Sequence, residues 1–271
     1  MSLKRLQLVV GVEPGPDGVA TGSTDFGAVE RGGLFGGQVV AQALSATALT
    51  APRGSVPVSI QAHFLGASQT GPSVEYHVER VRDGRALQHR DVRVFQEDKL
   101  IAHASVVSAI PADGADWQLP VMPRVGPPDL RPDAQRALFA LFSWGAFEMV
   151  LPLREGDGPP PTHPFWVRAD EALPEDPWLW GAVHAFWSDL GQNGDARTTH
   201  ERLLGPTSSV SATHSLVLHR RTPPHEWHLF DVTTQSLAGN QGFVQSSLFH
   251  ESGVLVASAS QSVFIRRPQA P

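Results

Sequence analysis

The chain of 271 residues contains no cysteine. This absence excludes disulfide frameworks, zinc sites with cysteine ligands, iron–sulfur clusters and catalytic thiols. Lysine is almost as scarce, since only Lys4 and Lys99 occur and arginine supplies the rest of the basic charge. With 21 basic against 27 acidic side chains the formal net charge is -6. We therefore expect no nucleic-acid partner, because binding phosphates without a basic surface releases few counterions.

Long apolar runs are also missing. The longest fall well short of the roughly 18 residues that a membrane-spanning helix needs. Near the N-terminus, the apolar run from Leu6 to Val12 is interrupted by Gln7 and ended by Glu13 and Pro14. It is too short for a secretory signal. We expect a cytoplasmic protein with no membrane partner.

Several motifs that carry chemistry are absent as well. The sequence has no Gly-Lys pair for a phosphate-binding loop, no G-x-G-x-x-G and no G-x-S-x-G. Its 12 histidines show no H-E-x-x-H spacing. His214 and His219 are five residues apart on an expected strand, so they should face opposite sides and could not chelate one ion. We expect neither a metal nor a cofactor.

What the chain does have is glycine and proline, 25 and 23 residues respectively. They are concentrated between residues 111 and 132, which leaves little room there for a helix or a central strand. Hydrophobic periodicity continues on both sides of this segment. The sequence therefore predicts an N-terminal domain at residues 1–112, a linker at 113–134 and a C-terminal domain at 135–271.

The first half reads as one helix followed by strands. Gly36-Gly37-Gln38 opens a segment that reaches Leu49, with apolar residues on one face, and this predicts a helix rich in small residues. Four strands are expected after it, at residues 56–65, 73–82, 86–97 and 100–110. Asp83-Gly84 and residues 97–99 supply the hairpin turns.

The second half repeats this plan. A helix is expected from Trp178 to about Gly191, with Asp176 as its N-cap and Pro177 at its first position. Four strands should follow at residues 210–219, 227–236, 242–250 and 254–265, and residues 251–253 make the last turn.

The two halves also match in detail. Residues 94–102 align without gaps on residues 248–256, and a strand of small residues follows each segment. This indicates an internal duplication of a unit made of one helix and an antiparallel sheet. The alignment places Gln261 opposite Val107, so an amide replaces an apolar residue in the second copy alone.

Three polar residues of the second half are candidates for chemistry. Asp189 lies near the end of an otherwise aromatic and apolar helix, where it either faces solvent or points inward to a partner. Inward burial would require hydrogen-bond donors and would tune the carboxylate as a base. Ser211 and Gln261 lie on strands, and each also has an ordinary interpretation: a strand hydroxyl for Ser211, an edge or solvent position for Gln261.

Residues 36–44 resemble the helix-opening signature of the acyl-CoA thioesterase II family, which are double hot-dog enzymes. Residues 63–65, 81–85 and 209–219, the Glu226-Trp227 pair, and residues 253–258 with Gln261 extend the resemblance. It spans residues 25–267 and is weaker at 111–164 and 191–206. It implies an α+β double hot-dog fold: two fused units, each an antiparallel sheet wrapped around a central helix. It also implies an acyl-CoA substrate and a homo-oligomer.

By this resemblance, Asp189, Ser211 and Gln261 fall on the family residues that bind the attacking water. Asp189, ionised at neutral pH, would take a proton from the water, which Ser211 and Gln261 would orient. Thr213 departs from the family, which often has Asp at that place, but the position is not catalytic.

The rest of the site is less defined by the sequence. The oxyanion would need backbone donors, and Gly37 heads a helix that could supply them. Trp180, Phe186 and Trp187 are candidates to line a slot for the acyl chain, although packing in the core is the more ordinary role of such residues. The expected function is hydrolysis of acyl-CoA to a free fatty acid and CoA.

Two other functions stay open at this stage. A hot-dog protein could bind acyl-CoA without hydrolysing it. Alternatively, a hot-dog enoyl-CoA hydratase or dehydratase would use a histidine with an acidic partner. His63 is the candidate histidine, but no acidic partner is evident for it.

Overall fold

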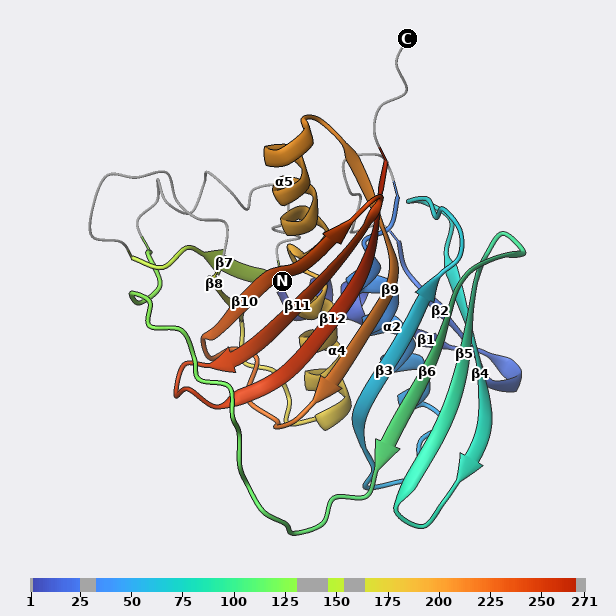
Figure 1. The fold of residues 1–271 in the computed structure, drawn as a ribbon. Helices are drawn as coiled ribbons and strands as arrows, with labels where there is room; N and C mark the ends of the chain where they lie inside the picture. The colour runs from blue at the N-terminus through green and yellow to red at the C-terminus, as the bar shows by residue number, and fades with distance from the viewer. Residues whose placement is uncertain (1, 25–32, 131–145, 154–163, 267–271) are drawn as a thin grey trace.

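A computed structural model of the chain describes residues 2–24, 33–130, 146–153 and 164–266. All strands of this part form one antiparallel sheet of 12 strands (Figure 1). The first unit consists of α1 (Ser2–Val10), β1 (Glu13–Pro14), the 3-10 turn η1 (Pro16–Gly18), β2 (Val19–Gly22), α2 (Gly36–Ala48), β3 (Val56–Phe64), β4 (Val74–Asp83), β5 (Leu87–Gln96) and β6 (Lys99–Ala109).

The second unit follows the same order, with one helix added. It consists of β7 (Phe147–Val150), β8 (Phe165–Ala169), α4 (Pro177–Ser188), α5 (Gln192–Leu204), β9 (Ser208–Leu218), β10 (His228–Ala238), β11 (Gln241–His250) and β12 (Leu255–Arg266). The two helices and eight strands predicted from the sequence are confirmed, most of them to within one or two residues.

The strand order reads the same from either edge. It runs β1-β2-β4-β5-β6-β3 in the first unit and β9-β12-β11-β10-β8-β7 in the second, so β3 and β9 pair at the centre. Ile60 pairs with Leu216 and Ala62 with His214 on either side of the central pair Gln61 and Ser215. The sheet curves around α2 and α4, which pack against each other (Figure 1). This is the expected double hot-dog arrangement, with a pseudo-twofold axis between β3 and β9.

The central helices begin in different ways. Asp176 caps α4, as predicted, because its carboxylate accepts hydrogen bonds from the backbone N–H groups of Trp178 and Leu179. Phe35 holds the N-cap position of α2 and has no polar side-chain atom. The N–H groups of Gln38 and Val39 donate to the backbone oxygen of Phe35, which leaves those of Gly36 and Gly37 to partners outside the helix.

The gapless alignment of the two halves is wrong by one residue at its end. Val94 of β5 pairs with Ala102, whereas its counterpart Leu248 of β11 pairs with Ala257. The turn before β12 is thus one residue longer than the tight turn at Glu97 and Asp98, which both have positive φ. Gln261 consequently corresponds to Val106 and not to Val107. The conclusion that an amide replaces an apolar residue in one copy stands, because Val106 is fully buried.

Helix α5 was not predicted. Apart from Ala196 and the terminal Leu203 and Leu204 its residues are polar or glycine, so it lacks the apolar stripe by which an amphipathic helix is recognised. It begins after Gly191, which has a φ of 76°, and Asp195 ties it to the sheet by accepting hydrogen bonds from the backbone N–H and the hydroxyl of Thr234. Helix α1 and the short outer strands β1, β2, β7 and β8 were also missed.

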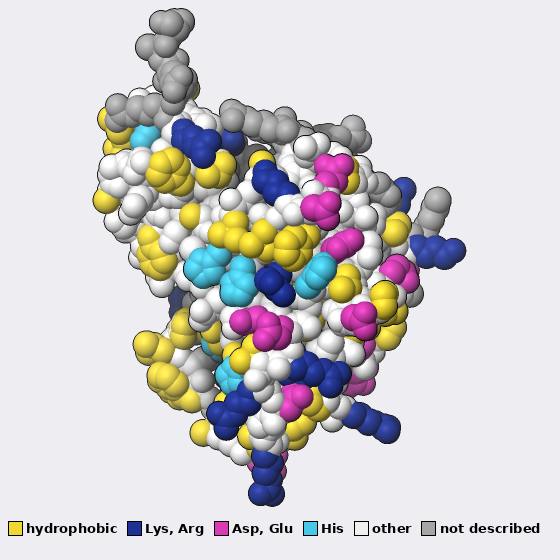
Figure 2. Space-filling view, turned by 90° about the vertical axis from the view of Figure 1, so that its right-hand side faces the viewer, with side chains coloured by type: hydrophobic (Ala, Val, Ile, Leu, Met, Phe, Trp, Pro, Cys, Tyr) yellow, Lys and Arg dark blue, Asp and Glu magenta, His cyan; other side chains and the backbone are white. Residues whose placement is uncertain are grey.

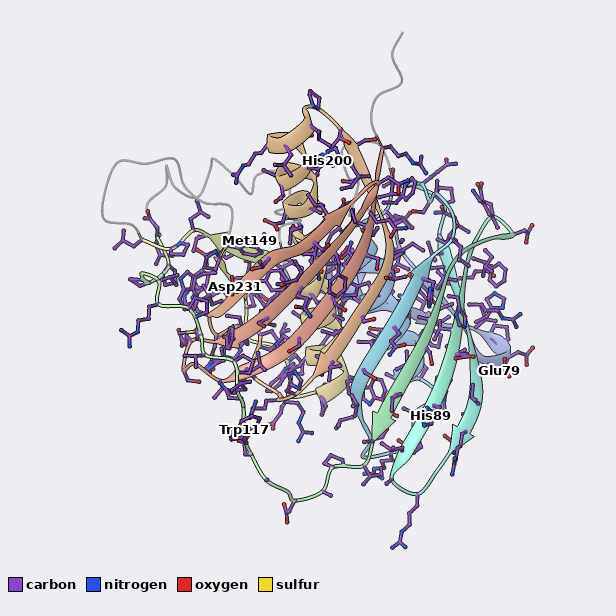
Figure 3. The ribbon with its side chains drawn as sticks, in the orientation of Figure 1. Glu79, His89, Trp117, Met149, His200 and Asp231 are labelled. Carbon is purple, nitrogen blue, oxygen red and sulfur yellow. The ribbon has the colours of Figure 1, made fainter. Side chains whose placement is uncertain are left out.

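The segment after β6 is pinned to the second unit. Asp116 forms an ion pair with Arg220. The Gln118 amide donates to the backbone oxygen of Gly253 and accepts from the backbone N–H of Leu255. Trp117 between them is 74% exposed (Figure 3). Residues 116–118 therefore form a strap that is bound to the second unit. The predicted boundary between linker and C-terminal domain, at residues 134 and 135, lies outside the described residues.

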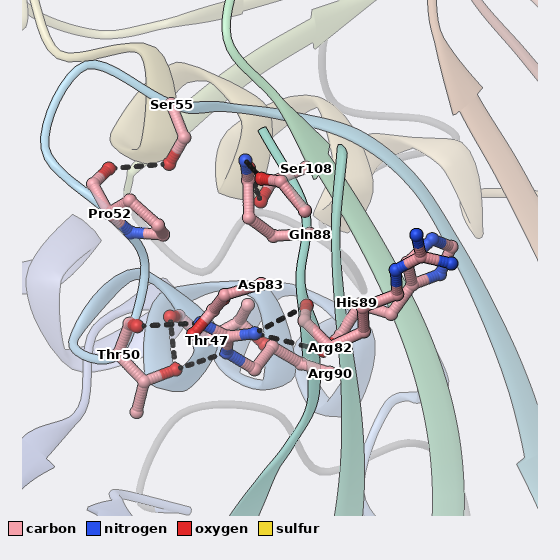
Figure 4. Close-up of polar contacts among 11 residues, drawn as sticks. Thr47, Thr50, Pro52, Ser55, Arg82, Asp83, Gln88, His89, Arg90 and Ser108 are labelled. Atoms are coloured by element: carbon pink, nitrogen blue, oxygen red, sulfur yellow. Dashed lines mark hydrogen bonds and ion pairs between the residues drawn. The ribbon is translucent and has the colours of Figure 1, made fainter. Parts of the chain in front are cut away.

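Arg90 of β5 is buried at the end of α2 (Figure 4). Its guanidinium donates to the hydroxyl and the backbone oxygen of Thr50 and to Asp83, at 2.6 Å. It also reaches the backbone oxygens of Arg82 and His89. A cation at the C-terminal end of a helix interacts favourably with its exposed carbonyl groups. Arg90 therefore closes the C-terminal end of α2.

The surface has mixed charge where it can be viewed. Figure 2 shows basic, acidic and histidine side chains interspersed on one face, around a band of apolar ones. None of the helices in the described residues has the length and apolar character needed to cross a membrane.

Candidate active site

Asp189 occupies the C-cap position of α4 and points inward, where it meets the N-terminus of α2. Its side chain is only 5% exposed. The backbone N–H of Gly37 and the side chain of Gln261 form hydrogen bonds with its carboxylate. Gly36 lies so close that a Cβ atom at this position would be 2.8 Å from Asp189 Oδ2. The solvent-facing interpretation of Asp189 is wrong, and the two helices of different units jointly enclose the carboxylate.

The electrostatics of this position differ from the sequence-based expectation. Burial raises the pKa of Asp189 from the ordinary 3.8 to about 7, although the hydrogen bonds from Gly37 and Gln261 act in the opposite direction. The carboxyl group is therefore partly protonated at neutral pH, not fully ionised as expected. A pKa close to the working pH is the value that suits a general base.

Gln261 and Ser211 lie beside this carboxylate. Gln261 is fully buried on β12, with β11 and β9 on its two sides, so it occupies neither an edge nor a solvent position. Its amide nitrogen donates to the hydroxyl oxygen of Ser211, which is half-buried on β9. The structure thus brings together all three residues that the sequence singled out.

One oxygen of Asp189 stays open. Within the described part of the chain, Asp189 Oδ1 is buried and has no hydrogen-bond partner. A buried carboxylate oxygen without a donor is costly, so it needs a donor that binds there. Water is the smallest such donor. The side chain of Gln261 binds the same carboxylate and also contacts the Ser211 hydroxyl, and His214 Nδ1 lies 3.8 Å from Oδ1.

His214, which its spacing brought to attention only as a possible metal ligand, has a role that the sequence did not reveal. His214 is fully buried on β9, with Nδ1 3.3 Å from Gln261 Oε1 and Nε2 2.8 Å from the hydroxyl of Ser188. Burial lowers its pKa to about 4, so the ring is neutral at pH 7. With the proton on Nδ1, His214 donates to Gln261 Oε1 and thereby directs the Gln261 amide nitrogen toward Ser211 and Asp189.

A β-bulge explains how Ser211 and His214 come to share a face. Residues three apart on a regular strand point to opposite sides. Here Ser211 pairs with Val263 and Thr213 with Ser262, so Ala212 is an extra residue on β9. The bulge returns Ser211 to the face that carries His214.

The other candidates have structural roles. Phe186 and Trp187 are fully buried, and Phe186 packs against the rings of Phe35 and Phe147, each with a centroid distance of 5.0 Å. Both residues therefore belong to the core. Trp180 is half-buried and lines a cavity near the start of α4. His63 is exposed on β3 and directly follows the buried Ala62, so it lies on the opposite face of the strand and does not enter the site.

No group of three or more His, Asp or Glu residues with metal-binding geometry occurs among the described residues. The site consists of a carboxylate, an amide and a hydroxyl, which are groups that position and deprotonate water.

Comparison with known proteins identifies relatives of both halves. Residues 27–109 match a family model described as the acyl-CoA thioesterase N-terminal domain, and residues 152–264 match one described as acyl-CoA thioesterase. Acyl-CoA thioesterase 2 of Haemophilus influenzae is 29% identical over 251 residues, which cover 86% of this chain and 87% of that protein. Human acyl-coenzyme A thioesterase 8 is 29% identical over 262 residues, covering 87% and 82% respectively.

Solved structures agree over almost the whole chain. An acyl-CoA thioesterase II from Mycobacterium marinum superposes with a TM-score of 0.80 at 25% identity, covering 97% of this chain and 99% of that one. A hot-dog protein from Alicyclobacillus acidocaldarius has a TM-score of 0.75 at 18% identity, with 97% and 98% coverage, which shows a shared fold.

Proposed function

The chain belongs to the acyl-CoA thioesterase II family and is an acyl-CoA hydrolase, and we propose that it cleaves the thioester by direct attack of a water molecule held by Asp189, Ser211 and Gln261. The observation that carries this mechanism is the buried carboxylate of Asp189, which lies beside the Gln261–Ser211 pair and whose Oδ1 has no hydrogen-bond partner among the described residues, with His214 Nδ1 3.8 Å away.

The reaction begins with a proton transfer. Ionised Asp189 accepts a proton from the bound water while the water oxygen forms a bond to the thioester carbonyl carbon. The tetrahedral intermediate then collapses, the carbon–sulfur bond breaks, and the proton on Asp189 passes to the leaving sulfur. The products are a free fatty acid and CoA. No covalent enzyme intermediate is needed, in keeping with a sequence that lacks cysteine.

Ser211 and Gln261 contribute by orientation. Holding the water in line with the carbonyl carbon removes much of the entropic barrier. His214 acts as a positioning residue, because its contact with Gln261 Oε1 at 3.3 Å fixes which end of the amide faces the water.

The oxyanion requires donors as negative charge develops on the carbonyl oxygen. We assign this role to the first turn of α2, whose N-cap Phe35 offers no side-chain acceptor. The Gly37 N–H is bound to Asp189, and the N–H groups of Gln38 and Val39 donate to the Phe35 backbone oxygen, so the N–H of Gly36 is the donor left for the oxyanion. The positive end of the helix macrodipole favours an anion at this position.

Release of free CoA tests the proposal directly. Thiol release is measured with acyl-CoA substrates from acetyl to palmitoyl, for the wild type and for Asp189→Ala. The wild type should release CoA, and the variant should lose the contribution of a general base, about 10²- to 10⁴-fold. Saturable binding without release would identify a non-hydrolytic binding protein. An unimpaired Asp189→Ala enzyme would reject Asp189 as the base.

A cytoplasmic location and a homo-oligomeric state are part of the same proposal. The location rests on the sequence, and the homo-oligomeric state rests on the usual association of hot-dog proteins through sheet edges or faces. Light scattering of the purified chain measures the oligomeric state, and a monomer at micromolar concentration would contradict the proposed homo-oligomer.

A further inference from the structure

Phe64, the last residue of β3, lies close to the catalytic carboxylate. A Cβ atom added to Gly36 would be 3.0 Å from Cζ and 3.4 Å from Cε1 of the Phe64 ring, and 2.8 Å from Asp189 Oδ2. The ring, from the first unit, and the carboxylate, from the second, therefore approach the same point at the start of α2. This places an aromatic side chain that the mechanism does not use beside the general base.

The strand register places Phe64 beside Ser211 as well. Strands β3 and β9 lie side by side at the centre of the sheet (Figure 1), and their last pair at this end is His63 with Thr213. The next residues on the face that packs against the central helices are Phe64 on β3 and, because of the bulge at Ala212, Ser211 on β9. Phe64 is thus a neighbour of the catalytic hydroxyl across the junction of the two units.

Solvent reaches the site on the side of this ring. Gly36, Phe64 and Ser211 are partly exposed, whereas Asp189 and Gln261 are buried. A substrate that approaches through the described part of the site therefore comes in along Phe64 and Ser211. The exposure of Phe64 marks it as a wall of the opening, because an aromatic residue that only filled the core would be buried.

The oxyanion donor determines how near the acyl group comes to this ring. The carbonyl oxygen, bound by the N–H of Gly36, would lie about 2.9 Å from the Gly36 nitrogen. The attacked carbon is one bond further, and the α-carbon of the acyl group is bonded to it. Because the ring lies against Gly36, the first carbons of the acyl group come within van der Waals reach of Phe64. Phe64 offers no hydrogen bond, which suits the purely apolar acyl side of the thioester.

The aromatic residues that the sequence offered for the acyl chain lie elsewhere. Phe186 and Trp187 are fully buried in the core, and Trp180 lies in the first turn of α4, at the opposite end of that helix from Asp189. Phe64 is the aromatic side chain that the described structure places at the opening of the site.

We propose that Phe64 is a specificity-determining residue, whose ring packs against the first carbons of the acyl group and limits branching there. The assignment rests on the proposed function, because it uses the positions of the attacking water and of the oxyanion donor. An unbranched chain presents a methylene group to the ring, whereas a methyl branch at the α-carbon has to displace the ring. One methyl group in such a contact changes the selectivity of an enzyme about 10- to 200-fold.

Selectivity between two matched substrates tests the proposal on the full-length protein. The pair is the best straight-chain acyl-CoA between butyryl and palmitoyl and its 2-methyl derivative, and CoA release gives kcat/KM for each. Phe64→Ala should raise the ratio of branched over straight substrate at least about tenfold, and Phe64→Leu should raise it by a smaller factor. Phe95→Ala is the matched control, since Phe95 is half-buried against His77 on the outer face of β5. It should keep the wild-type ratio.

Thermal unfolding shows which variants are folded, and Phe64→Leu decides the question if Phe64→Ala does not fold. An unchanged ratio in a folded Phe64 variant would overturn the proposal. So would an equal loss of kcat/KM for both substrates, since the ring would then support the site without touching the acyl group. If the wild type releases no CoA from any acyl-CoA, the proposed function is rejected, and the assignment of Phe64 with it.

Discussion

The backbone N–H of Gly37, in the first hot-dog unit, donates a hydrogen bond to the carboxylate of Asp189 in the second. The residues singled out for catalysis all belong to the second unit, but the backbone N–H that donates to the Asp189 carboxylate belongs to the first. Neither unit therefore contains the complete site, and the packing of α2 against α4 determines its geometry.

Replacing Gly36 by alanine should impair catalysis. The added Cβ would lie 2.8 Å from Asp189 Oδ2 and 3.0 Å from the Phe64 ring, so the carboxylate has to shift. Because a displacement of about 1 Å can cost on the order of 100-fold, kcat/KM should fall by one to two orders of magnitude. Gly114→Ala is the control, since its Cβ would have no neighbour within 4 Å. Equal activities of the two variants would contradict the close contact.

The rate should depend on pH through Asp189. Its pKa of about 7 makes the ionised, basic form minor at pH 6 and dominant at pH 8. kcat/KM should therefore rise with pH and level off above about pH 8, with an apparent pKa near 7. A pH series with one acyl-CoA substrate measures this. A profile that is flat between pH 5.5 and 8.5 would show that another group limits the reaction.

The free energy of unfolding should fall with rising pH over the range in which kcat/KM rises. The unfolded chain releases the Asp189 proton near pH 3.8, but the folded protein keeps it up to about pH 7. Between these values the folded state binds more protons, so the free energy of unfolding falls as pH rises. Asp189→Asn cannot titrate, and it should gain up to about 4 kcal/mol over the wild type between pH 4 and pH 8. Urea unfolding at the two pH values measures this, and a constant difference would refute the raised pKa.

Two variants of His214 should distinguish the contact of Nδ1 with Gln261 from the contact of Nε2 with Ser188. Asparagine places an amide nitrogen near the position of Nδ1 and keeps the donor to Gln261 Oε1, whereas glutamine reaches toward the position of Nε2 and Ser188. We expect His214→Gln to lower kcat about 10- to 100-fold with little change in KM, because orientation of the amide is lost. His214→Asn should restore part of the rate. Equal losses in both variants, with a raised KM, would indicate a merely structural role.

Arg90 should be needed for stability and not for catalysis. It is buried and donates to Thr50 and Asp83, so Arg90→Leu leaves their acceptors without a donor. Asp83 is half-exposed and can be solvated by water, so the main loss is the donor to the Thr50 oxygens, which costs about 1–3 kcal/mol. Arg93→Leu, exposed on the same strand, is the control and should change stability little. Thermal unfolding compares the two, and any Arg90→Leu protein that folds should keep its kcat.

Residues that obey simple periodicities were predictable. The hairpin strands alternate, Asp176 and Pro177 start α4, and Gly36-Gly37 open α2, so local patterns predicted the duplicated unit of one helix and an antiparallel sheet. The family resemblance then implied the double hot-dog fold. Asp189 could be singled out because a carboxylate in an apolar helix needs an explanation. The raised pKa of Asp189 could not be predicted, because it results from burial of the carboxylate between two helices that are far apart in the sequence.

Irregular positions escaped prediction for physical reasons. The bulge at Ala212 reverses the side to which Ser211 points, so alternation alone separates it from His214. One extra residue in the turn before β12 shifts the comparison of the copies from Val107 to Val106. Helix α5 depends on contacts such as Asp195 with Thr234, which no local pattern reveals.

The palindromic order of the strands has a further consequence for how such a protein can change. In a symmetric pair of identical chains every substitution is made twice, so a buried acid that destabilises one protomer destabilises both. Here the two copies share one covalent chain, so the cost of an ionised Asp189 is incurred once for each pair of hot-dog units. The other copy is then free to carry Val106 at the place of Gln261 and to bind the end of its central helix with Arg90. Because the two halves are covalently fused, each half can carry substitutions that the other half lacks.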